Sequence, residues 1–425
     1  MSNSSTTQSS TKGWRFYINS KMLICVFMGF TSGLPLFVTL NLLQAWLQDF
    51  KVDLTSAGLF ALVQFPYTWK FFWAPIMDRF VPSFGLWKPG RRRSWMLITS
   101  ILVMITIAAL GLLSPKEQIW LVAAMCSALA FFSASMDIVI DAYRRELLSD
   151  EQQGPGTALH VNAYRVSGLI PGALSLALAD FLPWSQVFMI TAAFMIPGIV
   201  TMLIIKEPTN TEQLPKTLAE AVVLPFREFL NRRGTTYALL ILAFIFLYKL
   251  GDSMALALAT RFYLDIGFTK SDIALIAKTV SFWGSLAGGF IGAIGLVKLG
   301  LNRGLWLFGL AQMISTAGFA VLAKLGAIKI ALATVLIFES VSYGMGTAAF
   351  IAYIATITDI RYTATQFALF TSLSAIPRTF ANATTGAIVD ALGYFSFFLI
   401  CTALAIPGLL LLFKIAPWNS RQQNQ

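Results

Sequence analysis

Long apolar stretches that alternate with short polar ones set the pattern of this sequence. About twelve of these stretches run for roughly 18 to 25 residues with few charges, the length that a helix needs to cross about 30 Å of hydrocarbon. They fall near residues 22–45, 57–77, 94–113, 118–140, 157–179, 186–205, 237–260, 271–295, 304–323, 330–356, 364–388 and 394–414. The pattern therefore predicts an all-α membrane protein with twelve transmembrane helices.

The two halves of the chain resemble each other. The segments 158–180 and 368–390 both begin with Ala-Leu, end with Asp and lie 210 residues apart, and each contains one arginine, Arg165 or Arg378. The charged, proline-containing stretch 206–236 separates the first six predicted spans from the last six. Duplicated six-helix bundles are the architecture of one large class of secondary transporters. We therefore predict two pseudo-symmetric six-helix bundles.

Composition and charge support a membrane protein with both termini in the cytoplasm. The chain is 57% apolar and 12% charged, whereas a soluble chain is about 25% charged. Lys and Arg are concentrated in the segments that become cytoplasmic in this orientation, so the net charge of +11 is a topology signal and not a nucleic-acid-binding surface. The predicted parts are a cytoplasmic tail at 1–21, bundles at 22–205 and 237–416, a cytoplasmic linker with a short surface helix at 206–236, and a cytoplasmic tail at 417–425.

The N-terminal region has no pattern typical of a cleavable signal. The first apolar run is too long and lacks a small-residue cleavage site, so we expect it to remain as the first transmembrane helix. The three cysteines, Cys25, Cys126 and Cys401, all lie inside predicted spans. Neither a disulfide framework nor a metal site is therefore expected, and nothing in the sequence calls for a cofactor.

Four carboxylates inside predicted spans are candidates for proton coupling, because ionisable groups in a membrane are costly and usually functional. Asp137 and Asp141 lie at i and i+4 on one face of the fourth span, Asp252 lies in the seventh and Glu339 in the tenth. A buried carboxylate can take up a proton near neutral pH, which a proton-coupled carrier requires.

Each of these carboxylates also has a structural alternative. Asp141 is close enough in sequence to pair with Arg144 or Arg145. Asp252 can neutralise Lys249 at i, i+3 and so keep the seventh helix in the bilayer, and Glu339 can hydrogen-bond a neighbouring helix.

Cationic side chains inside the spans are candidates for binding an anionic substrate. Arg165 and Arg378, which the repeat nearly relates, can hold carboxylates bidentately from the two bundles. Their alternative is pairing between helices, with an acid or with free carbonyls. The further binding candidates are Lys249, Lys70 and Gln44, with Tyr67, Tyr164 and Tyr343 as rings that can stack on sugars.

Glycines and one charged loop are candidates for conformational change. Glycine and proline interrupt the first span at GFTSGLP, and glycines lie in YKLGDS and in GMG after Glu339. The loop after the second span contains Asp78-Arg79 and Gly90-Arg-Arg-Arg93, which resembles the signature of the major facilitator superfamily, where such charges hold the bundles together on the cytoplasmic side. The candidates are Gly29, Gly33, Pro35, Gly251, Gly344, Gly346, Asp78, Arg79, Arg91 and Arg92.

Several polar or glycine-rich strings resemble one branch of this superfamily, the AmpG-type muropeptide permeases. The strings are FTSGLPLFVTLNLLQAWL, DLTSAGLFALV, PYTWKFFWAPIMDR, GRRRSW, MDIVIDAYR, YKLGDSMA, ESVSYGMGTAAFIAY and TATQFALFTSLSAIPR. The resemblance covers residues 22–416 and implies a major facilitator fold in a bacterial cytoplasmic membrane.

The family's activity is what the resemblance implies for this chain. It implies proton-motive-force-dependent import of peptidoglycan turnover fragments, GlcNAc-1,6-anhydro-MurNAc with or without stem peptide, from periplasm to cytoplasm. These fragments feed wall recycling and signal β-lactamase induction. The expected partners are the anhydromuropeptide, protons and the lipid bilayer, without nucleic acid and with a monomer as the default. The residues carried over are Gly29, Gly33, Asp137, Asp141, Lys249, Asp252 and Arg378.

The sequence departs from the family's pattern at three residues, and two alternative functions are considered. Met136, Ala163 and Pro377 differ from the family's pattern and could change which muropeptides are accepted. The family is related to acetyl-coenzyme A carriers, so another bulky organic anion is an alternative substrate. The string Asp137-Ile-Val-Ile-Asp141 resembles one Mg²⁺-diphosphate motif of intramembrane prenyltransferases, but these enzymes need two such motifs. We therefore expect a transporter and not an enzyme.

Overall fold

The computed structural model describes residues 19–52, 65–82, 90–208, 217–269 and 272–418. All regular elements in these ranges are helical, which confirms the predicted all-α architecture. The elements before residue 209 are α1 (Ser20–Phe37), η2 (Val38–Leu42), α2 (Leu43–Asp49), α4 (Phe65–Trp69), η4 (Lys70–Phe72), α5 (Ala74–Arg79), α6 (Arg91–Leu110), α7 (Ile119–Leu147), α8 (Asp150–Ser167), η5 (Ile170–Leu174), α9 (Ser175–Ala179), α10 (Trp184–Ala193) and α11 (Ile196–Ile204).

The second part of the chain is also helical. Its elements are α12 (Leu218–Arg232), α13 (Thr235–Leu247), α14 (Leu250–Ala257), α15 (Ala259–Asp265), η6 (Ile273–Lys278), α17 (Thr279–Leu299), α18 (Leu301–Leu325), α19 (Lys329–Ile357), η7 (Ile360–Tyr362) and α20 (Thr363–Ile415). Gly393, with φ 74° and ψ 164°, divides α20 into two helices. The bundle boundaries at 22–205 and 237–416 stay predictions.

Nine helical stretches within the described ranges are long and apolar enough to cross a membrane. Three predicted spans are not among them, for different reasons. The span 57–77 lies partly outside the described residues, and 157–179 is helical but divided among α8, η5 and α9. The span 364–388 belongs to α20, where the side chains of residues 376–383 are not described. These findings are consistent with the predicted count of twelve.

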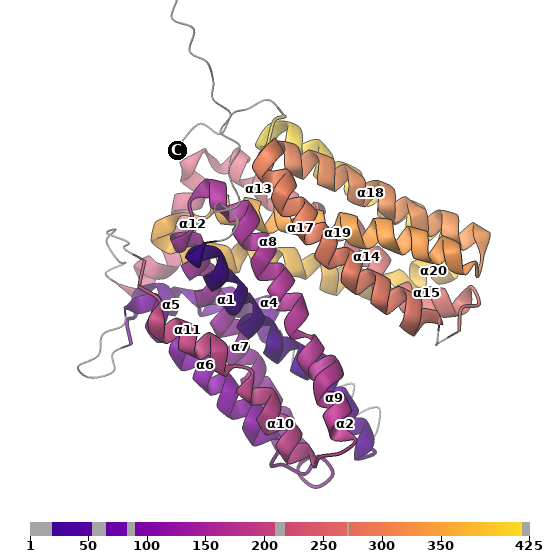
Figure 1. Cartoon of the computed structure of the whole chain (residues 1–425). Helices are drawn as coiled ribbons and strands as arrows, with labels where there is room; N and C mark the ends of the chain where they lie inside the picture. The colour runs from indigo at the N-terminus through magenta and orange to yellow at the C-terminus, as the bar shows by residue number, and fades with distance from the viewer. Residues whose placement is uncertain (1–18, 53–64, 83–89, 209–216, 270–271, 419–425) are drawn as a thin grey trace, which may run out of the picture.

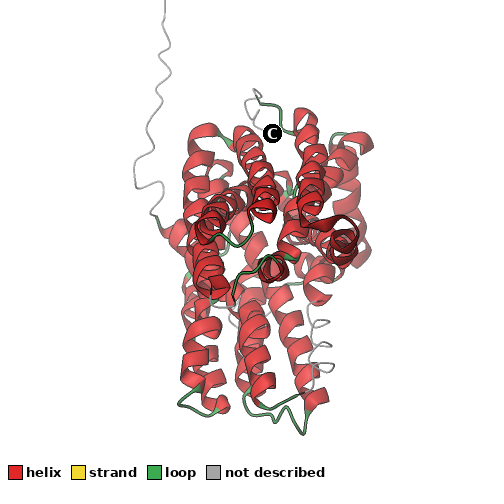
Figure 2. Ribbon diagram, turned by 90° about the vertical axis from the view of Figure 1, so that its right-hand side faces the viewer, coloured by secondary structure: helices red, strands yellow, loops and turns green. Residues whose placement is uncertain are grey.

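The helices form two arms that meet at one end and diverge at the other (Figure 1). One arm contains α1 to α11 and the other contains α13 to α20. At the closed end α5 and α7 pack against α20, and deeper along the arms α8 packs against α17 and α19. The tips with α2, α9 and α10 on one arm and α15 on the other define the open end (Figure 1). Figure 2 shows the same helices joined by short loops at the ends.

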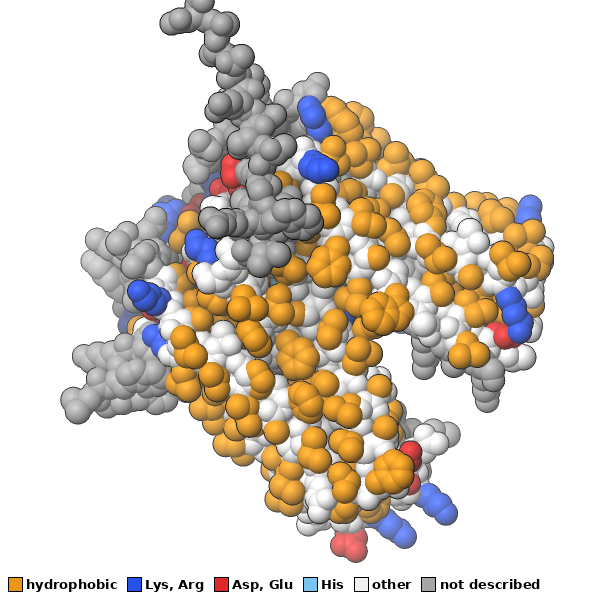
Figure 3. All heavy atoms as spheres, viewed as in Figure 1, with side chains coloured by type: hydrophobic (Ala, Val, Ile, Leu, Met, Phe, Trp, Pro, Cys, Tyr) orange, Lys and Arg blue, Asp and Glu red, His pale blue; other side chains and the backbone are white. Residues whose placement is uncertain are grey.

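Apolar side chains cover the flanks of both arms, while Lys, Arg, Asp and Glu gather at their ends (Figure 3). The exposed apolar residues include Leu239, Phe290, Ile314, Val321 and Phe413, each at least half exposed. An apolar patch of this extent is typical of a surface that faces lipid. The exposed apolar side chains on the flanks therefore explain why the chain is so rich in apolar residues, and an unusually large buried core is not required.

Equivalent turns start two helices 210 residues apart. Gly90 precedes α6 with φ 104°, and Gly300 precedes α18 with φ 80°. Both conformations lie in the left-handed region that glycine adopts without steric cost. The two positions have the same spacing as the segments 158–180 and 368–390, which is consistent with a duplicated chain.

Two helices that pack together each contain a π-helical turn. In the first, α1 contains Pro35 and continues as η2, and in the second η5 follows α8 and contains Pro171. Proline removes a backbone donor from the helix, and π turns are common at functional sites. The segments η2 and η5 contact each other at the level of the space between the arms.

Candidate functional site

A cavity of about 470 Å³ lies between the arms, and residues of both arms line it. Its volume is in the range of small-molecule binding sites. Its polar lining contains both signs of charge, because Arg165 and Glu339 face it. The lining residues are Phe37, Asn41, Arg165, Gly168, Leu169, Leu256, Ser281, Phe282, Ser285, Glu339, Ser340 and Tyr343.

Arg165 extends from α8 to the opposite arm. Its guanidinium donates a 2.7 Å hydrogen bond to the backbone carbonyl of Ser285 in α17, and its Cζ lies 5.3 Å from the centre of the Tyr343 ring. The contact with a carbonyl is the inter-helix alternative considered for this residue. Because the guanidinium also lines the cavity, it has further donors available for an anion.

Lys249 and Asp252 form an ion pair next to the same tyrosine. The Nζ of Lys249 lies 3.3 Å from the Asp252 carboxylate and 4.4 Å from the centre of the Tyr343 ring. Asp252 is buried and also accepts a 3.4 Å hydrogen bond from the side-chain amide of Gln312 in α18. Tyr343 therefore contacts two cations, Arg165 from one arm and Lys249 from the other, and its ring is attractive to both.

Glu339 lies on α19 one turn before Tyr343 and is only 4% exposed. Its carboxylate accepts a 3.4 Å hydrogen bond from Ser340 and is within electrostatic range of Lys249, Asp252 and Arg165. The structure thus brings the sequence candidates Arg165, Lys249, Asp252, Glu339 and Tyr343 into one cluster between the arms.

Asp137 belongs to a separate cluster inside the first arm. Its carboxylate on α7 accepts a hydrogen bond from Ser32 of α1. Lys70, buried in η4, lies within electrostatic range of Asp137, and so does the hydroxyl of Tyr67 on α4. Asp141, one turn further along α7, pairs with Arg144 at 2.9 Å, the structural alternative for this residue.

The closed end is built around a carboxylate that belongs to one arm and binds the other. Asp78 is fully buried at the end of α5 and accepts hydrogen bonds from the backbone amides of Ala364 and Thr365, 3.2 and 2.7 Å long. These amides lie in the first turn of α20, where the helix dipole favours a negative charge. Arg92 of α6 pairs with the same carboxylate at 2.9 Å.

Glu146 extends this cluster, which we call the closed-end cluster: Asp78, Arg92, Glu146, Thr363 and Thr365. Glu146 of α7 pairs with Arg92 at 2.6 Å and accepts a 2.9 Å hydrogen bond from the hydroxyl of Thr363. Two acids of the first arm thus contact the start of α20. Among the other loop candidates, Arg91 donates to the backbone carbonyl of Asp78, and Arg79 lies over the ring of Phe80 at 5.4 Å.

A second charged cluster ties α12 to the second arm. Arg232 of α12 pairs with Glu228 and with Asp359, and Arg361 pairs with the same two acids. Burial tends to raise the pKa of Asp359, but its hydrogen bonds from Arg361 and the nearby positive charges outweigh burial and lower the pKa. The side-chain amide of Gln366 in α20 donates to Glu228 at 2.8 Å.

The glycine candidates lie at close approaches between helices. A Cβ at Gly29 or Gly33 of α1 would overlap backbone atoms of α8, and a Cβ at Gly251 would overlap the Cys401 carbonyl of α20. At Gly344 it would overlap the backbone of α17, and at Gly346 the side chain of Gln312. These positions let the helices pack in contact, and their proposed role in conformational change stays a prediction.

Besides Lys70 and Tyr67 near Asp137, three further binding candidates lie apart from the cavity or have side chains outside the described part of the structure. Gln44 is exposed on α2, and Tyr164 packs edge-on against Phe37 at 5.8 Å. The side chain of Arg378 is not among those described. Sequence reasoning missed Ser32, Gln312 and Glu146, although a polar residue in an apolar span, as in GLAQM, is a signal that could have found Gln312.

Comparison with known proteins identifies the family. The sequence profile of the Major Facilitator Superfamily matches residues 23–382. The anhydromuropeptide permease of Escherichia coli (strain K12) is 40% identical over 405 residues, which are 95% of this chain and 81% of that protein. The chain belongs to the AmpG-type permeases of the major facilitator superfamily. This AmpG-type permease is also 45% identical to an uncharacterized protein of Haemophilus influenzae, over 98% of this chain and 97% of that one.

Solved structures of the superfamily have the same fold as this permease. The transporter FucP in its outward conformation gives a TM-score of 0.70 at 16% identity, covering 96% of this chain and all of that one. The proton:xylose symporter XylE gives a TM-score of 0.66 at 12% identity, covering 93% and 94%. The predicted major facilitator fold is thereby confirmed. The chain is a multi-pass membrane transporter. Its membership of this family excludes the hypothesis that it is an intramembrane prenyltransferase.

Proposed function

We propose that this permease imports anhydromuropeptides, GlcNAc-1,6-anhydro-MurNAc with or without stem peptide, from the periplasm to the cytoplasm. The observation that carries the proposal is the 40% identity to the Escherichia coli anhydromuropeptide permease along 95% of the chain. The cavity between the arms supports it, because its lining combines the cation Arg165 with aromatic and apolar surface. Sugars bearing carboxylates fit such a lining.

The cluster between the arms would bind the cargo. Arg165 and Lys249 would hold its carboxylates, with Arg378 as a further cation of the second arm. Tyr343, Phe37 and Phe282 would contact the sugar rings. Because Arg165 and Lys249 come from different arms, one bound anion would contact both.

Uptake would be coupled to protons through carboxylates of the cluster between the arms and of the separate cluster around Asp137. In the cavity cluster, protonation of Asp252 would release Lys249 from its ion pair and leave it free for an anion. Asp137 would carry the proton through the first arm, where Lys70 and Tyr67 lie near it. Glu339 is the third candidate, since it lies among three other charges.

The direction of transport follows from the proposed topology. With both termini in the cytoplasm, the end with α5, α12 and the start of α20 is cytoplasmic, and the open end faces the periplasm. The cargo would then enter from the periplasm while the closed-end cluster is intact, and rocking of the arms would release it inside. The permease would act as a monomer in the inner membrane, and its cargo would feed wall recycling and the signal for β-lactamase induction.

Uptake of labelled anhydromuropeptide into right-side-out vesicles, with and without a protonophore, tests the proposal. We expect uptake by the wild type and its loss when the protonophore is added, with inverted vesicles as the orientation control. No uptake by folded wild-type protein would contradict the muropeptide assignment. A panel of other bulky organic anions, including acetyl-coenzyme A, would then identify the class of cargo.

A further inference from the structure

The two arms are joined beside the cavity by two side chains of α8. Asn162 donates a 3.1 Å hydrogen bond to the carbonyl of Leu286, and Arg165 donates its 2.7 Å bond to the carbonyl of Ser285. The donors are one turn apart, and the acceptors are consecutive carbonyls of α17. We call this pair of hydrogen bonds the α8–α17 clasp.

The helices approach closely enough for this contact because α17 has glycines at the interface. A Cβ at Gly289 would overlap the amide oxygen of Asn162. Each carbonyl of a helix keeps a second lone pair after it accepts its own intrahelical bond. The clasp therefore adds to the hydrogen bonds of α17 without replacing them.

Arg165 belongs to the clasp and to the cavity at once. While its guanidinium holds the Ser285 carbonyl, it also lines the cavity and stacks on the Tyr343 ring. Asn162, in contrast, is buried between α8 and α17 and is not among the residues that line the cavity. Only one of the two clasp residues is thus within reach of a ligand.

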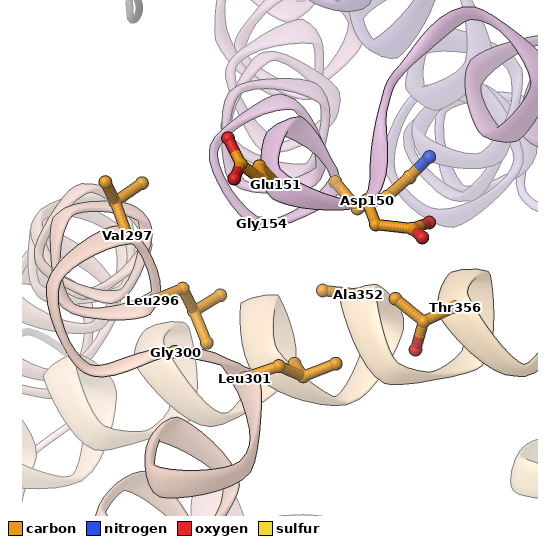
Figure 4. A pocket seen from close by; sticks show the side chains of 10 residues that line it. Asp150, Glu151, Gly154, Leu296, Val297, Gly300, Leu301, Ala352 and Thr356 are labelled. Carbon is orange, nitrogen blue, oxygen red and sulfur yellow. The ribbon is translucent and has the colours of Figure 1, made fainter. Parts of the chain in front are cut away.

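Beyond the clasp, the same interface is less tightly filled. A second cavity of about 160 Å³ lies where the start of α8 faces the turn between α17 and α18, with Asp150 and Gly154 on one side and Leu296 and Leu301 on the other (Figure 4). Contacts across this part of the interface are therefore interrupted by free volume.

Polar atoms buried along α8 are unpaired in the closed arrangement. Among the described atoms, Gln153 Oε1, Thr157 Oγ1 and Asn162 Oδ1 have no hydrogen-bond partner. An unpaired buried polar group is unfavourable, and Asn162 Oδ1 lies directly against Gly289 of α17, so separating α8 from α17 would hydrate this atom. The clasp acts against this tendency.

We propose that Arg165 is the residue through which cargo opens the cytoplasmic side: a carboxylate in the cavity withdraws its guanidinium from the Ser285 carbonyl and so releases the α8–α17 clasp. A charged acceptor forms a stronger hydrogen bond with arginine than a neutral carbonyl does, so the carboxylate wins the competition. This inference rests on the proposed function, and it makes Arg165 a positioning residue as well as a binding one.

Distances between spin labels at Glu151→Cys and Lys298→Cys test the proposal. Both positions are exposed, one at the start of α8 and the other at the end of α17, and Cys25, Cys126 and Cys401 are first replaced by Ser. The probes are GlcNAc-1,6-anhydro-MurNAc, with its lactyl carboxylate, and the analogue in which that carboxylate is a neutral amide. Binding of both probes is measured by calorimetry in nanodiscs.

We expect the acid to widen the label distance of the wild type and the amide not to do so. The acid should also bind at least about tenfold more tightly than the amide, the order of one charged hydrogen bond. Arg165→Gln should lose this preference, because glutamine keeps a donor for the carbonyl but has no charge, and its distance should not respond to the acid.

Label distances measured in variants without added ligand test the α8–α17 clasp by itself. Asn162→Ala should widen the distance while it keeps the acid affinity within about twofold. Thr157→Ala is the control, because its buried hydroxyl has no described partner, and it should not widen the distance.

An equal response of the wild type to acid and amide, a response of Arg165→Gln to the acid, or an unchanged distance in Asn162→Ala would each overturn the inference. Binding of neither probe by the wild type would instead contradict the proposed function, and the ligand-free variants would still decide whether the clasp holds the arms together.

Discussion

Asp78 and Thr365 lie 287 residues apart in the chain, and the carboxylate of Asp78 accepts hydrogen bonds from both the amide and the hydroxyl of Thr365, each 2.7 Å long. An acid from one arm therefore caps a helix of the other arm. A helix end favours an anion, and Arg92 supplies the countercharge from the acid's own arm.

Replacing Asp78 by Asn should weaken this closure. The neutral amide loses the attraction of the helix end and leaves buried Arg92 with Glu146 as its remaining acidic partner, so we expect a loss of about 2 to 4 kcal/mol in the free energy of unfolding. Thermal unfolding in detergent measures the change. Asp150→Asn is the control, since Asp150 is 60% exposed in its pair with Arg145 and should matter by less than about 1 kcal/mol. Equal melting temperatures for both variants would show that Asp78 does not hold the closed end together.

The Lys249–Asp252 pair should behave as a unit. Lys249→Met or Asp252→Leu alone leaves an uncompensated charge near the cavity and should destabilise the protein by about 3 kcal/mol. The double variant should lose clearly less than the sum of the single variants, because neither charge is left alone. A double-mutant cycle of unfolding free energies measures this coupling, and additive losses would mean that the ion pair does not stabilise the structure.

Gly29 should be intolerant of even a methyl group. Its α-carbon lies against the backbone of His160, so Gly29→Ala would push α1 away from α8, and we expect a loss of stability of about 1 to 3 kcal/mol. Gly386→Ala is the matched control in a helix, because nothing lies within 4 Å of its added Cβ, and the better helix propensity of alanine should leave it neutral or slightly stabilised. Similar melting temperatures for the two variants would argue against contact packing at Gly29.

The proton site can be separated from the binding site by its kinetics. If Asp137 carries the proton, Asp137→Asn should abolish protonophore-sensitive accumulation in vesicles while exchange of labelled for unlabelled cargo continues. The reason is that exchange needs binding and rocking but no net proton movement. Accumulation that survives in Asp137→Asn would move the role to Asp252 or Glu339, to be tested with the corresponding Asn and Gln variants.

Much of the fold was predictable, because the apolar spans and the charges that interrupt them can be recognised from the residue types alone. Asp252, Glu339 and Arg165 stood out as ionisable groups in apolar surroundings, and the structure brings them together. Their partners did not stand out. Arg165 donates to the carbonyl of Ser285 and Asp78 accepts from the amide of Ala364, and every residue except proline offers the same backbone groups.

Asp137 shows a different limit of prediction. Its burial was predictable from its place in an apolar span, but its separation from the cluster between the arms was not. Which side of α7 faces the neighbouring helices of its own arm depends on tertiary packing, and Ser32, its partner, is one of many hydroxyl residues in the spans.

The π-helical turn η2 also determines the orientation of the tip of the first arm. In an α-helix each residue turns the chain by about 100°, and a π turn accommodates one residue more than an α turn does. Beyond η2, Trp46 of α2 is fully buried, with its ring 5.0 Å from that of Phe188 in α10. If Val38–Leu42 were wound as a regular α-helix with the same residues, Trp46 would be rotated away from Phe188 by roughly a quarter of a circle, whereas deletion of one residue from this segment would restore a regular helix and keep Trp46 facing Phe188. The segment Val38–Leu42 should thus tolerate the loss of one residue better than a regular α-helical turn does.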